Sequence, residues 1–443
     1  MYRSIILILI LLPGFQPLYA QKISSEQTNR ITHNLFEYGQ WKSLIVEGKR
    51  ALNEDIEFDS LHIRMGIAYF ELHKYMLSIP HLNKAFLHKP GDTILLEYLY
   101  FALRYANREM EAAKLLEDNR LVLNRLLEKE FNKKLPGELY FTSGSVISSN
   151  EKTINKIDID GENNFFGYAD PVSSIFFLNA GISHKISPVV NLHFAYNHIK
   201  VNRKEIAFKN NIDLRNEPHN MFQREYYLGT DILLKNSYYL KPAIHYLHVA
   251  YQTAGFTGKF NSLDAAIYKP SDISINSMVY FLGLSKYYNW YNLGVGLSFS
   301  NLNNNKQYQA GINWTTFPTG NLNFYTICNF TVQYQEKGRF IADIKAGVSI
   351  LPKLWLEGFY NFGERTNFVS DNGYTAYNMQ EVIKSGAGAN ILMPLWKNLE
   401  LDLYYQFMIR ENYYTTYKNS TNFEHINYQF KTHSIIGGIK WTF

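Results

Sequence analysis

The stretch Ile439-Lys440-Trp441-Thr442-Phe443 alternates apolar and polar residues and closes the chain on an aromatic side chain. An alternation of period two predicts a β-strand whose two faces meet different surroundings. A closing strand that ends on an aromatic residue is typical of barrels in a Gram-negative type of outer membrane. We therefore expect a membrane β-barrel at this end of the chain, inserted into the lipid bilayer by the barrel assembly machinery through the strand that ends in Phe443.

Residues 1–20 have the pattern of a secretory signal. Arg3 precedes an apolar run at positions 5–12, and Leu18-Tyr19-Ala20 offers a cleavage site. This pattern predicts a cleavable signal peptide, because a retained membrane anchor needs roughly 18 or more apolar residues. The sequence thus predicts export into the cell envelope.

The composition narrows the class of protein. Apolar residues make up 46% of the chain, with 34 Tyr and 30 Phe, but no long apolar span follows the signal. This excludes helical membrane insertion and allows a barrel, whose strands carry only alternating hydrophobicity. The small formal charge of +5 argues against nucleic acid as a partner. Because Cys328 is the single cysteine, no intrachain disulfide is expected.

Downstream of Pro136-Gly137 the chain reads as a succession of strands. In residues 340–350 and again in 399–409, apolar side chains stand at every second position. In lipid, the apolar face of such strands points outward and the polar face lines the interior. The pattern predicts fourteen strands, an even number as bacterial barrels require. They are expected to begin near residues 138, 173, 190, 222, 238, 273, 290, 306, 322, 338, 353, 381, 398 and 430.

The predicted connections alternate between short and long. This asymmetry is typical of tight periplasmic turns and longer outer loops, and it places both ends of the barrel in the periplasm. Tyr413, Tyr414 and Tyr417, in one of the outer links, are candidates for contact with an external ligand. The short turns include 187–188, 235–236, 318–321 and 351–352, and the longer links include 203–221, 252–272, 365–380 and 411–427.

Side chains of both charge signs are predicted to face the barrel interior. Mixed charge favours a hydrated, partly salt-bridged lumen over a strongly ion-selective pore, in a barrel wide enough for a channel unless loops or side chains fill it. The many aromatic residues near strand ends predict girdles at the membrane surfaces. The predicted lumen residues are Asp231, Asp343, Lys345, Lys384, Glu400, Asp402, Arg410 and Lys440.

No pattern typical of an enzyme or of a metal site occurs in the sequence. It contains no nucleophile elbow, no phosphate-binding glycine loop and no HExxH helix. His245 and His248 are separated by an odd spacing, which sends them to opposite faces of a strand. We therefore expect a protein that is not an enzyme and that carries no cofactor and no metal.

Upstream of Pro136, apolar residues recur at helical spacing with a repeat of about 34 residues. This segment, roughly residues 25–127, resembles tetratricopeptide repeats, in which small residues let two helices cross closely and aromatics fill the gap between them. One period later the pattern is looser, with Asn107 and Glu109 in place of small and aromatic residues. The best copy contains Met65-Gly66, Tyr69, Tyr75, Ser78, Ala85 and Pro90, and one period earlier Gly39, Trp41 and Ala51 fall in register with His73, Tyr75 and Ala85.

The resemblance implies that the repeats stack into a curved array whose concave side binds a partner. The first helix of each unit would line that side. The alternative is that half of the aromatic residues among them only pack between repeats. The implied groove residues are Ile63, Ile67, Phe70, Glu71, Tyr98, Phe101 and Tyr105.

The expected fold is α plus membrane β: a signal peptide at 1–20, a periplasmic tetratricopeptide-like helical domain at 21–135 and a 14-stranded antiparallel transmembrane β-barrel at 136–443. This organisation resembles surface-lipoprotein export modulators, exopolysaccharide export porins and YaiO-like outer-membrane proteins. The resemblance implies an export or assembly factor whose repeats bind a periplasmic or outer-membrane protein partner or a polysaccharide cargo, which the barrel conducts or presents. The alternatives are a docking subunit of an envelope complex and a simple diffusion porin.

Overall fold

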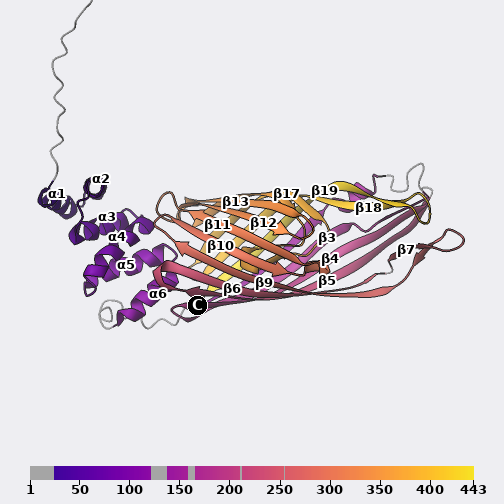
Figure 1. Ribbon diagram of the computed structural model, residues 1–443, viewed down its shortest axis with the longest axis horizontal. Helices are drawn as coiled ribbons and strands as arrows, with labels where there is room; N and C mark the ends of the chain where they lie inside the picture. Colours follow the sequence, from indigo (N-terminus) through magenta and orange to yellow (C-terminus); the bar gives the residue numbers. More distant parts are fainter. Residues whose placement is uncertain (1–23, 121–136, 158–164, 210–211, 254) are drawn as a thin grey trace, which may run out of the picture.

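The computed structural model describes residues 24–120, 137–157, 165–209, 212–253 and 255–443. Within these ranges, helices α1 to α6 gather at one end of a long β-barrel, and the C-terminus lies at that same end (Figure 1). We call this end of the barrel the helical end and the opposite one the distal end. The predicted signal peptide lies outside the described residues.

In the N-terminal part, α1 and α5 begin at side-chain caps. Ser24 and Gln27 form a capping box at α1, each side chain accepting the other's backbone N–H. The Asp92 carboxylate accepts two backbone N–H groups at the start of α5. No helix in the described ranges is long and apolar enough to cross a membrane. The bounds are α1 Ser25–Glu37, α2 Trp41–Asn53, α3 Asp59–Glu71, α4 Tyr75–His88, α5 Thr93–Tyr105 and α6 Glu109–Asp118.

The six helices form three helix–turn–helix units with the same turn. Gly39, His73 and Asn107 stand one repeat apart, between the two helices of their units, and have φ values of +63°, +56° and +57°. These left-handed values suit glycine and tolerate asparagine. The looser third copy of the sequence pattern therefore keeps the backbone conformation of the other two.

The second unit shows why a small residue is needed where its helices cross. A Cβ atom added to Gly66 of α3 would lie 2.5 Å from Leu82 Cδ2 of α4. Ser78 Oγ of α4 donates a hydrogen bond of 2.7 Å to the Gly66 carbonyl oxygen. The helices thus approach closely enough for a side chain of one to bond the backbone of the other.

The remainder of the chain forms a closed barrel of fourteen antiparallel strands, which confirms the predicted strand number and fold class. Each strand pairs with its neighbours in chain order, and β1 pairs with β19 to close the ring. Short elements lie in the connections: α9 Asn150–Ile154, β2 Phe166–Ala169, β7 Phe256–Phe260, β8 Ala266–Tyr268, β15 Phe368–Ser370 and β16 Thr375–Tyr377. The barrel strands are β1 Gly137–Ser148, β3 Val172–Ser187, β4 Val190–Lys209, β5 Ile212–Leu233, β6 Tyr238–Thr253, β9 Ser271–Tyr287, β10 Tyr291–Ser300, β11 Gln307–Thr316, β12 Phe324–Tyr334, β13 Gly338–Leu351, β14 Leu354–Arg365, β17 Val382–Trp396, β18 Leu399–Tyr417 and β19 Phe423–Thr442.

The barrel is apolar outside and polar inside. On β19, Ile435 is 64% exposed whereas its neighbour Ser434 is 3% exposed, and on β10 Leu297 is 62% exposed whereas Asn292 is buried. This arrangement is the reverse of that in a water-soluble barrel and matches a bilayer as surroundings. The fold is that of an outer-membrane-type transmembrane barrel.

The helical domain is attached to the barrel rim through α4. The turn between β11 and β12 reaches the start of this helix, where Met76 N donates to Gly320 O at 2.9 Å and Asn321 Nδ2 donates to His73 O at 3.0 Å. Phe317 of the same turn is buried in the apolar core formed by α4 and α5. One barrel turn is therefore part of the helical core.

A second attachment lies at α6 and involves buried charge. The guanidinium of Arg108 donates to Glu111 and, at 2.7 Å, to Ser237 Oγ of the turn between β5 and β6. Tyr239 donates to the Glu111 carboxylate at 3.0 Å, and Lys185 of β3 pairs with Glu109. The helical domain thus spans the helical end of the barrel between two separate turns of its rim.

Candidate functional site

The lumen contains a loop that the sequence places among the outer links. Residues 366–381 leave β14 at its distal end, form the small hairpin of β15 and β16, and return to β17. The hairpin folds into the barrel and contacts the inner wall on several sides. We call residues 366–381 the inward loop. The expectation of a long link at 365–380 is met in length but not in direction.

Hydrogen bonds hold the first half of the inward loop against β11 and β12. Gln309 donates to Val369 O at 2.8 Å and accepts from Val369 N at 2.9 Å. The Gln333 amide donates to Thr366 O at 2.9 Å and to Asn367 O at 3.1 Å. These buried amide side chains take the place of strand partners for the loop backbone.

The second half of the inward loop reaches the opposite wall. His245 of β6 lies 3.0 Å from Gly373 O, and Tyr227 of β5 donates to Asn372 O at 3.3 Å. The Tyr374 hydroxyl lies 3.4 Å from that of Tyr140 on β1. Because β1 lies opposite β11 in the ring of fourteen strands, the loop crosses the lumen.

Buried ion pairs secure the two ends of the inward loop. Arg365, at its start, is 2% exposed and pairs with Asp343 of β13. At its other end Glu381 lies 3.4 Å from Arg203 of β4, and that guanidinium also bonds Asp170 at 3.0 Å. Removing one member of such a pair leaves a buried charge without compensation, at a cost of about 3–5 kcal/mol. The loop is thus anchored by charge as well as by amide hydrogen bonds.

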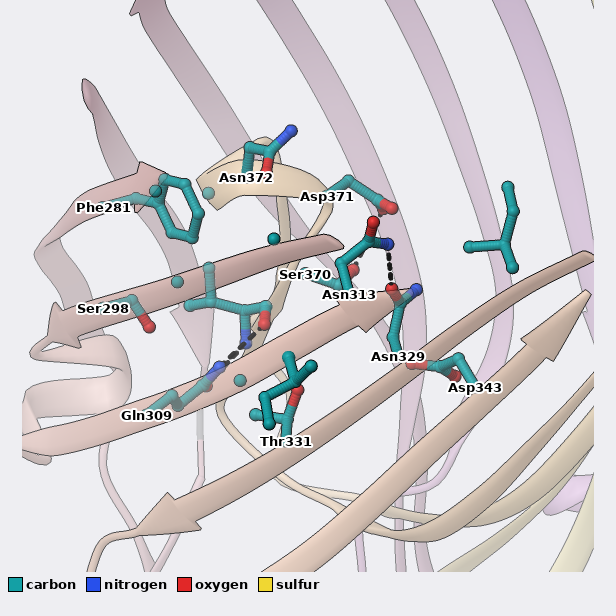
Figure 2. A pocket seen from close by; sticks show the side chains of 18 of the residues that line it. Phe281, Ser298, Gln309, Asn313, Asn329, Thr331, Asp343, Ser370, Asp371 and Asn372 are labelled. Carbon is teal, nitrogen blue, oxygen red and sulfur yellow. Dashed lines mark hydrogen bonds between the residues drawn. The ribbon is translucent and has the colours of Figure 1, made fainter. Parts of the chain in front are cut away.

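Beneath the inward loop, a cavity of about 490 Å³ opens among strands β6, β9 to β14 and β18. Figure 2 shows Asp371 and Asn372 of the loop together with side chains of the barrel wall, among them the hydrogen-bonded pair Asn313 and Asn329. The lining of the cavity extends from Asn292, the second residue of β10 near the helical end, to the inward loop. The lumen is therefore a polar chamber that the loop bounds on the distal side.

Seven of the eight predicted lumen residues lie on the inner face of the barrel, mostly in ion pairs. Lys345 and Asp343 line the cavity, and Arg410 is buried with a nitrogen 3.4 Å from Met379 Sδ of the inward loop. Lys440 pairs with Glu400 at 2.9 Å. The remaining two are Asp231, which bonds His193 and Lys241, and Asp402, on the same face of β18 as Glu400.

Lys384 differs from its predicted position. It pairs with Glu364 at 2.8 Å and with Glu411 at 3.0 Å. Glu411 lies an even number of residues from the exposed Leu403 and Tyr405 of β18, so it is on the same, outer face of the strand. Lys384 and its two glutamate partners therefore lie on the outer face. Lys384 faces outward because the register between β17 and β18 shifts between Ile383 and Ser385. One extra residue at this point reverses which side chains of β17 face the lumen.

The implied groove residues fall into two groups. Ile67 is buried in the apolar core of the helical domain, and Ile63 is partly buried against it. The other five come together: Phe70 contacts Tyr98 with ring centroids 5.0 Å apart, and the Tyr98 hydroxyl donates to Glu71 at 3.2 Å. Tyr75 of α4, which the groove prediction omits, contacts Phe70 edge-on and Tyr105 at a tilt, with ring centroids 5.3 and 4.9 Å apart. We call Phe70, Glu71, Tyr75, Tyr98, Phe101 and Tyr105 the aromatic cluster.

Two of the three tyrosines predicted for external contact are core residues instead. Tyr414 is buried against Tyr428, and Tyr417 is buried against Phe166, with ring centroids 6.1 and 5.7 Å apart. Only Tyr413 of the three is exposed. The reason is that β18 and β19 continue beyond the expected strand ends, so the loop predicted there is a packed sheet. In the described ranges no group of three or more His, Cys, Asp or Glu could hold a metal ion.

No protein-family model matches this chain, and a search of curated proteins found no match. Among solved structures it is similar to a deltaS2 mutant of the TodX monoaromatic hydrocarbon channel, with 7% identity, a TM-score of 0.44 and coverage of 70% of this chain and 91% of that one. A FadL homologue of Pseudomonas aeruginosa gives 8% identity, a TM-score of 0.42 and coverage of 70% and 90%. A bacterial polysaccharide outer membrane secretin gives 8% identity, a TM-score of 0.34 and coverage of 69% and 98%.

Proposed function

We propose that this protein is an outer-membrane export or assembly factor. Its helical domain, in the periplasm, captures a protein partner or a surface-protein, lipoprotein or polysaccharide cargo, and the barrel conducts or presents that cargo at the surface. The observation that carries the proposal is the attachment of the helical domain to two turns of one barrel mouth, through Phe317 and through Arg108. Binding on the helices is thereby coupled to the entrance of the lumen.

The inward loop supports a gated passage rather than an open diffusion pore. It crosses the lumen and is held by hydrogen bonds and buried ion pairs at both ends. Passage of a macromolecule requires the loop to move, and a loop held largely by polar contacts can exchange these for contacts with water or cargo. The aromatic cluster on α3 to α5 supports a binding role for the helices, because partly exposed aromatic side chains are favoured at protein interfaces.

Conductance across planar bilayers tests the gate. We expect the purified full-length protein to conduct rarely and the double variant Gln333→Ala, Asn378→Ala to conduct persistently, because Gln333 and Asn378 tie the loop to β12 and β5. Gln252→Ala removes an exposed glutamine from β6 and serves as the matched control. A large steady current through the wild type would indicate a diffusion porin instead.

Deletion of residues 25–118 tests the coupling to export. We expect the barrel to remain folded, as heat-dependent migration on a denaturing gel reports, while a surface component detected by whole-cell labelling is lost. Unchanged surface composition would contradict the export role. Loss of the component in the deletion, but not in a full-length variant whose lumen is filled with bulky side chains, would favour the docking subunit.

A further inference from the structure

Polar side chains stand side by side on four neighbouring strands of the cavity wall. Asn313 of β11 is directly opposite Asn329 of β12, Asn329 is opposite Asp343 of β13, and Asp343 is opposite Asn361 of β14. Cross-strand hydrogen bonds join Asn313 to Asn329 and, at 2.5 Å, Asn361 to Asp343. We call these four residues the amide belt. It runs around the barrel wall at one level and lies within the lining of the cavity.

Glycines leave room in front of the amide belt. Gly294 of β10 is directly opposite Asn313, and Gly296 is opposite Gly311. All three line the cavity. A Cβ atom added to Gly294 would lie 3.2 Å from Ser285 Cβ, and one added to Gly296 would lie 2.9 Å from the Phe281 ring, so side chains at these positions would crowd the cavity lining. The cavity volume of about 490 Å³ lies within the range of small-molecule sites, roughly 300–1,000 Å³.

The positive charges around this cavity are compensated within the protein, and the lining carboxylate of Asp371 accepts hydrogen bonds from Ser370 at 3.0 Å and Thr375 at 2.8 Å. Among the described residues that line the cavity, the cations are Lys241, Lys345 and Arg365. Lys345 lies 3.2 Å from Glu357 and Lys241 lies 3.8 Å from Asp231, while Arg365 pairs with Asp343. An anionic ligand would have to compete with these carboxylates for each cation. The site therefore favours an uncharged ligand.

Aromatic rings complete the wall. Phe359 of β14 and Tyr404 of β18 stack with centroids 5.0 Å apart and an interplanar angle of 7°, and Phe281 lies on the β9 side of the cavity. Asparagine side chains offer donors and acceptors together, as hydroxyl groups do. Aromatic rings offer apolar faces to the C–H surface of a ring-shaped ligand. This combination suits a molecule with alternating hydroxyl and C–H faces.

We propose that the cavity binds a segment of an uncharged, polyhydroxylated glycan that enters from the helical end. The proposal rests on the proposed export function and specifies the cargo of the lumen. The amide belt bonds the sugar hydroxyls, the rings of Phe359 and Phe281 contact sugar faces, and the inward loop bounds the site until it is displaced. The cavity volume of about 490 Å³ limits the bound segment to a short part of the glycan, so a longer chain would pass segment by segment.

Neutral oligosaccharides test the assignment as probes. Maltohexaose, cellohexaose and chitohexaose are titrated into the full-length protein by calorimetry and added to the conducting variant Gln333→Ala, Asn378→Ala in bilayers. We expect at least one of them to bind and to block current, with the double variant Asn313→Ala, Asn329→Ala binding about tenfold more weakly because two hydrogen-bonding side chains are lost. Oligogalacturonate, an anionic probe, should bind less well than the neutral probes.

Matched variants separate the belt from general damage to the barrel. Thr316→Ala, Thr326→Ala removes a cross-strand hydroxyl pair from the same two strands outside the cavity lining and should leave binding unchanged. Gly294→Leu fills the cavity, favours strand formation and should abolish binding with a folded barrel. No binding by any neutral probe, or tighter binding of oligogalacturonate, overturns the inference while a gated current still supports the proposed function. Sugar binding without current in any variant supports the inference and contradicts the conducting role.

Discussion

At the scale of single residues, the close crossing of α3 and α4 depends on Gly66. A side chain there would overlap Leu82, and overpacking of a well-packed core costs about 1–3 kcal/mol. We expect Gly66→Val to lower the free energy of unfolding of the helical domain by that amount while the barrel stays folded. The change would appear as a lower urea midpoint of the helical circular dichroism signal. Gly91→Val is the control, since a Cβ at Gly91 meets nothing within 4 Å. Equal midpoints for the two variants would show that the helices do not cross as described.

A residue-scale dependence on pH follows from the pair His62 and His81. Burial, and then the neighbouring His62, lower the pKa of His81 from 6.5 to about 4. Because the unfolded state binds a proton near pH 6.5 and the folded state does not until about pH 4, stability of the helical domain should fall as pH drops through this window. The loss should be about 2–3 kcal/mol.

The His81→Gln variant checks this origin of the pH dependence. Its urea midpoint should vary much less between pH 6.5 and 4 than that of the wild type. Glu57, whose pKa is lowered by hydrogen bonds from Lys84 and His62, contributes a loss in the same direction but at lower pH. His88→Gln, at an exposed position beside Asp59, is the control. A wild type whose stability is flat across the window would contradict the buried, neutral state of His81.

At the scale of elements, the seam between β1 and β19 closes the barrel. Gly137 and Phe443 exchange backbone hydrogen bonds of 2.9 and 3.1 Å, and a Cβ at Gly137 would lie 2.5 Å from the Phe443 ring. We expect Gly137→Val to displace that ring and to lower the temperature at which the folded barrel unfolds on a denaturing gel. Gly338→Val, where a Cβ meets nothing within 4 Å, should have little effect. Unchanged heat resistance in both would show that the seam tolerates a displaced terminal ring.

The elements also show what alternation can and cannot predict. The strands β10, β13 and β18 could be located from sequence. An apolar outer face and a polar inner face make hydrophobicity alternate with a period of two along each strand. The register shift that turns Lys384 outward has no such signature, since one extra residue in a strand changes the facing without changing composition. The inward loop was predicted only as a long link, because Gln309 and Gln333, which hold it, are far from it in sequence.

The same limit applied to the aromatic cluster. The repeat pattern located Phe70 and Tyr98 on successive first helices, as observed. Tyr75 was missed because it belongs to a second helix and joins the cluster only through the tight turn at His73. Contacts between side chains on either side of a three-residue turn can therefore be predicted only once the crossing of the two helices is known.

At the scale of the whole molecule, Arg108 links the two domains. It is 4% exposed, bonds Glu111 and Ser237, and lies over the Tyr287 ring at 5.3 Å. We expect Arg108→Ala to leave Glu111 buried without its cation and to weaken the α6 attachment by about 3–5 kcal/mol. Hydrogen–deuterium exchange should then accelerate in α6 and in the turn at 233–239. Arg50→Ala, which removes an exposed pair with Glu54, should not change exchange there.

The same variant tests whether the molecule works as one unit. If the helical domain controls entry to the lumen, loosening α6 should change gating although Arg108 is far in sequence from the inward loop. We expect Arg108→Ala to alter the frequency of current openings relative to the wild type, whereas Arg50→Ala should not. Faster exchange at α6 with unchanged gating would show that the helices and the inward loop respond to cargo independently. In that case the helical domain would act as a tether, and the gate would answer only to what enters the cavity.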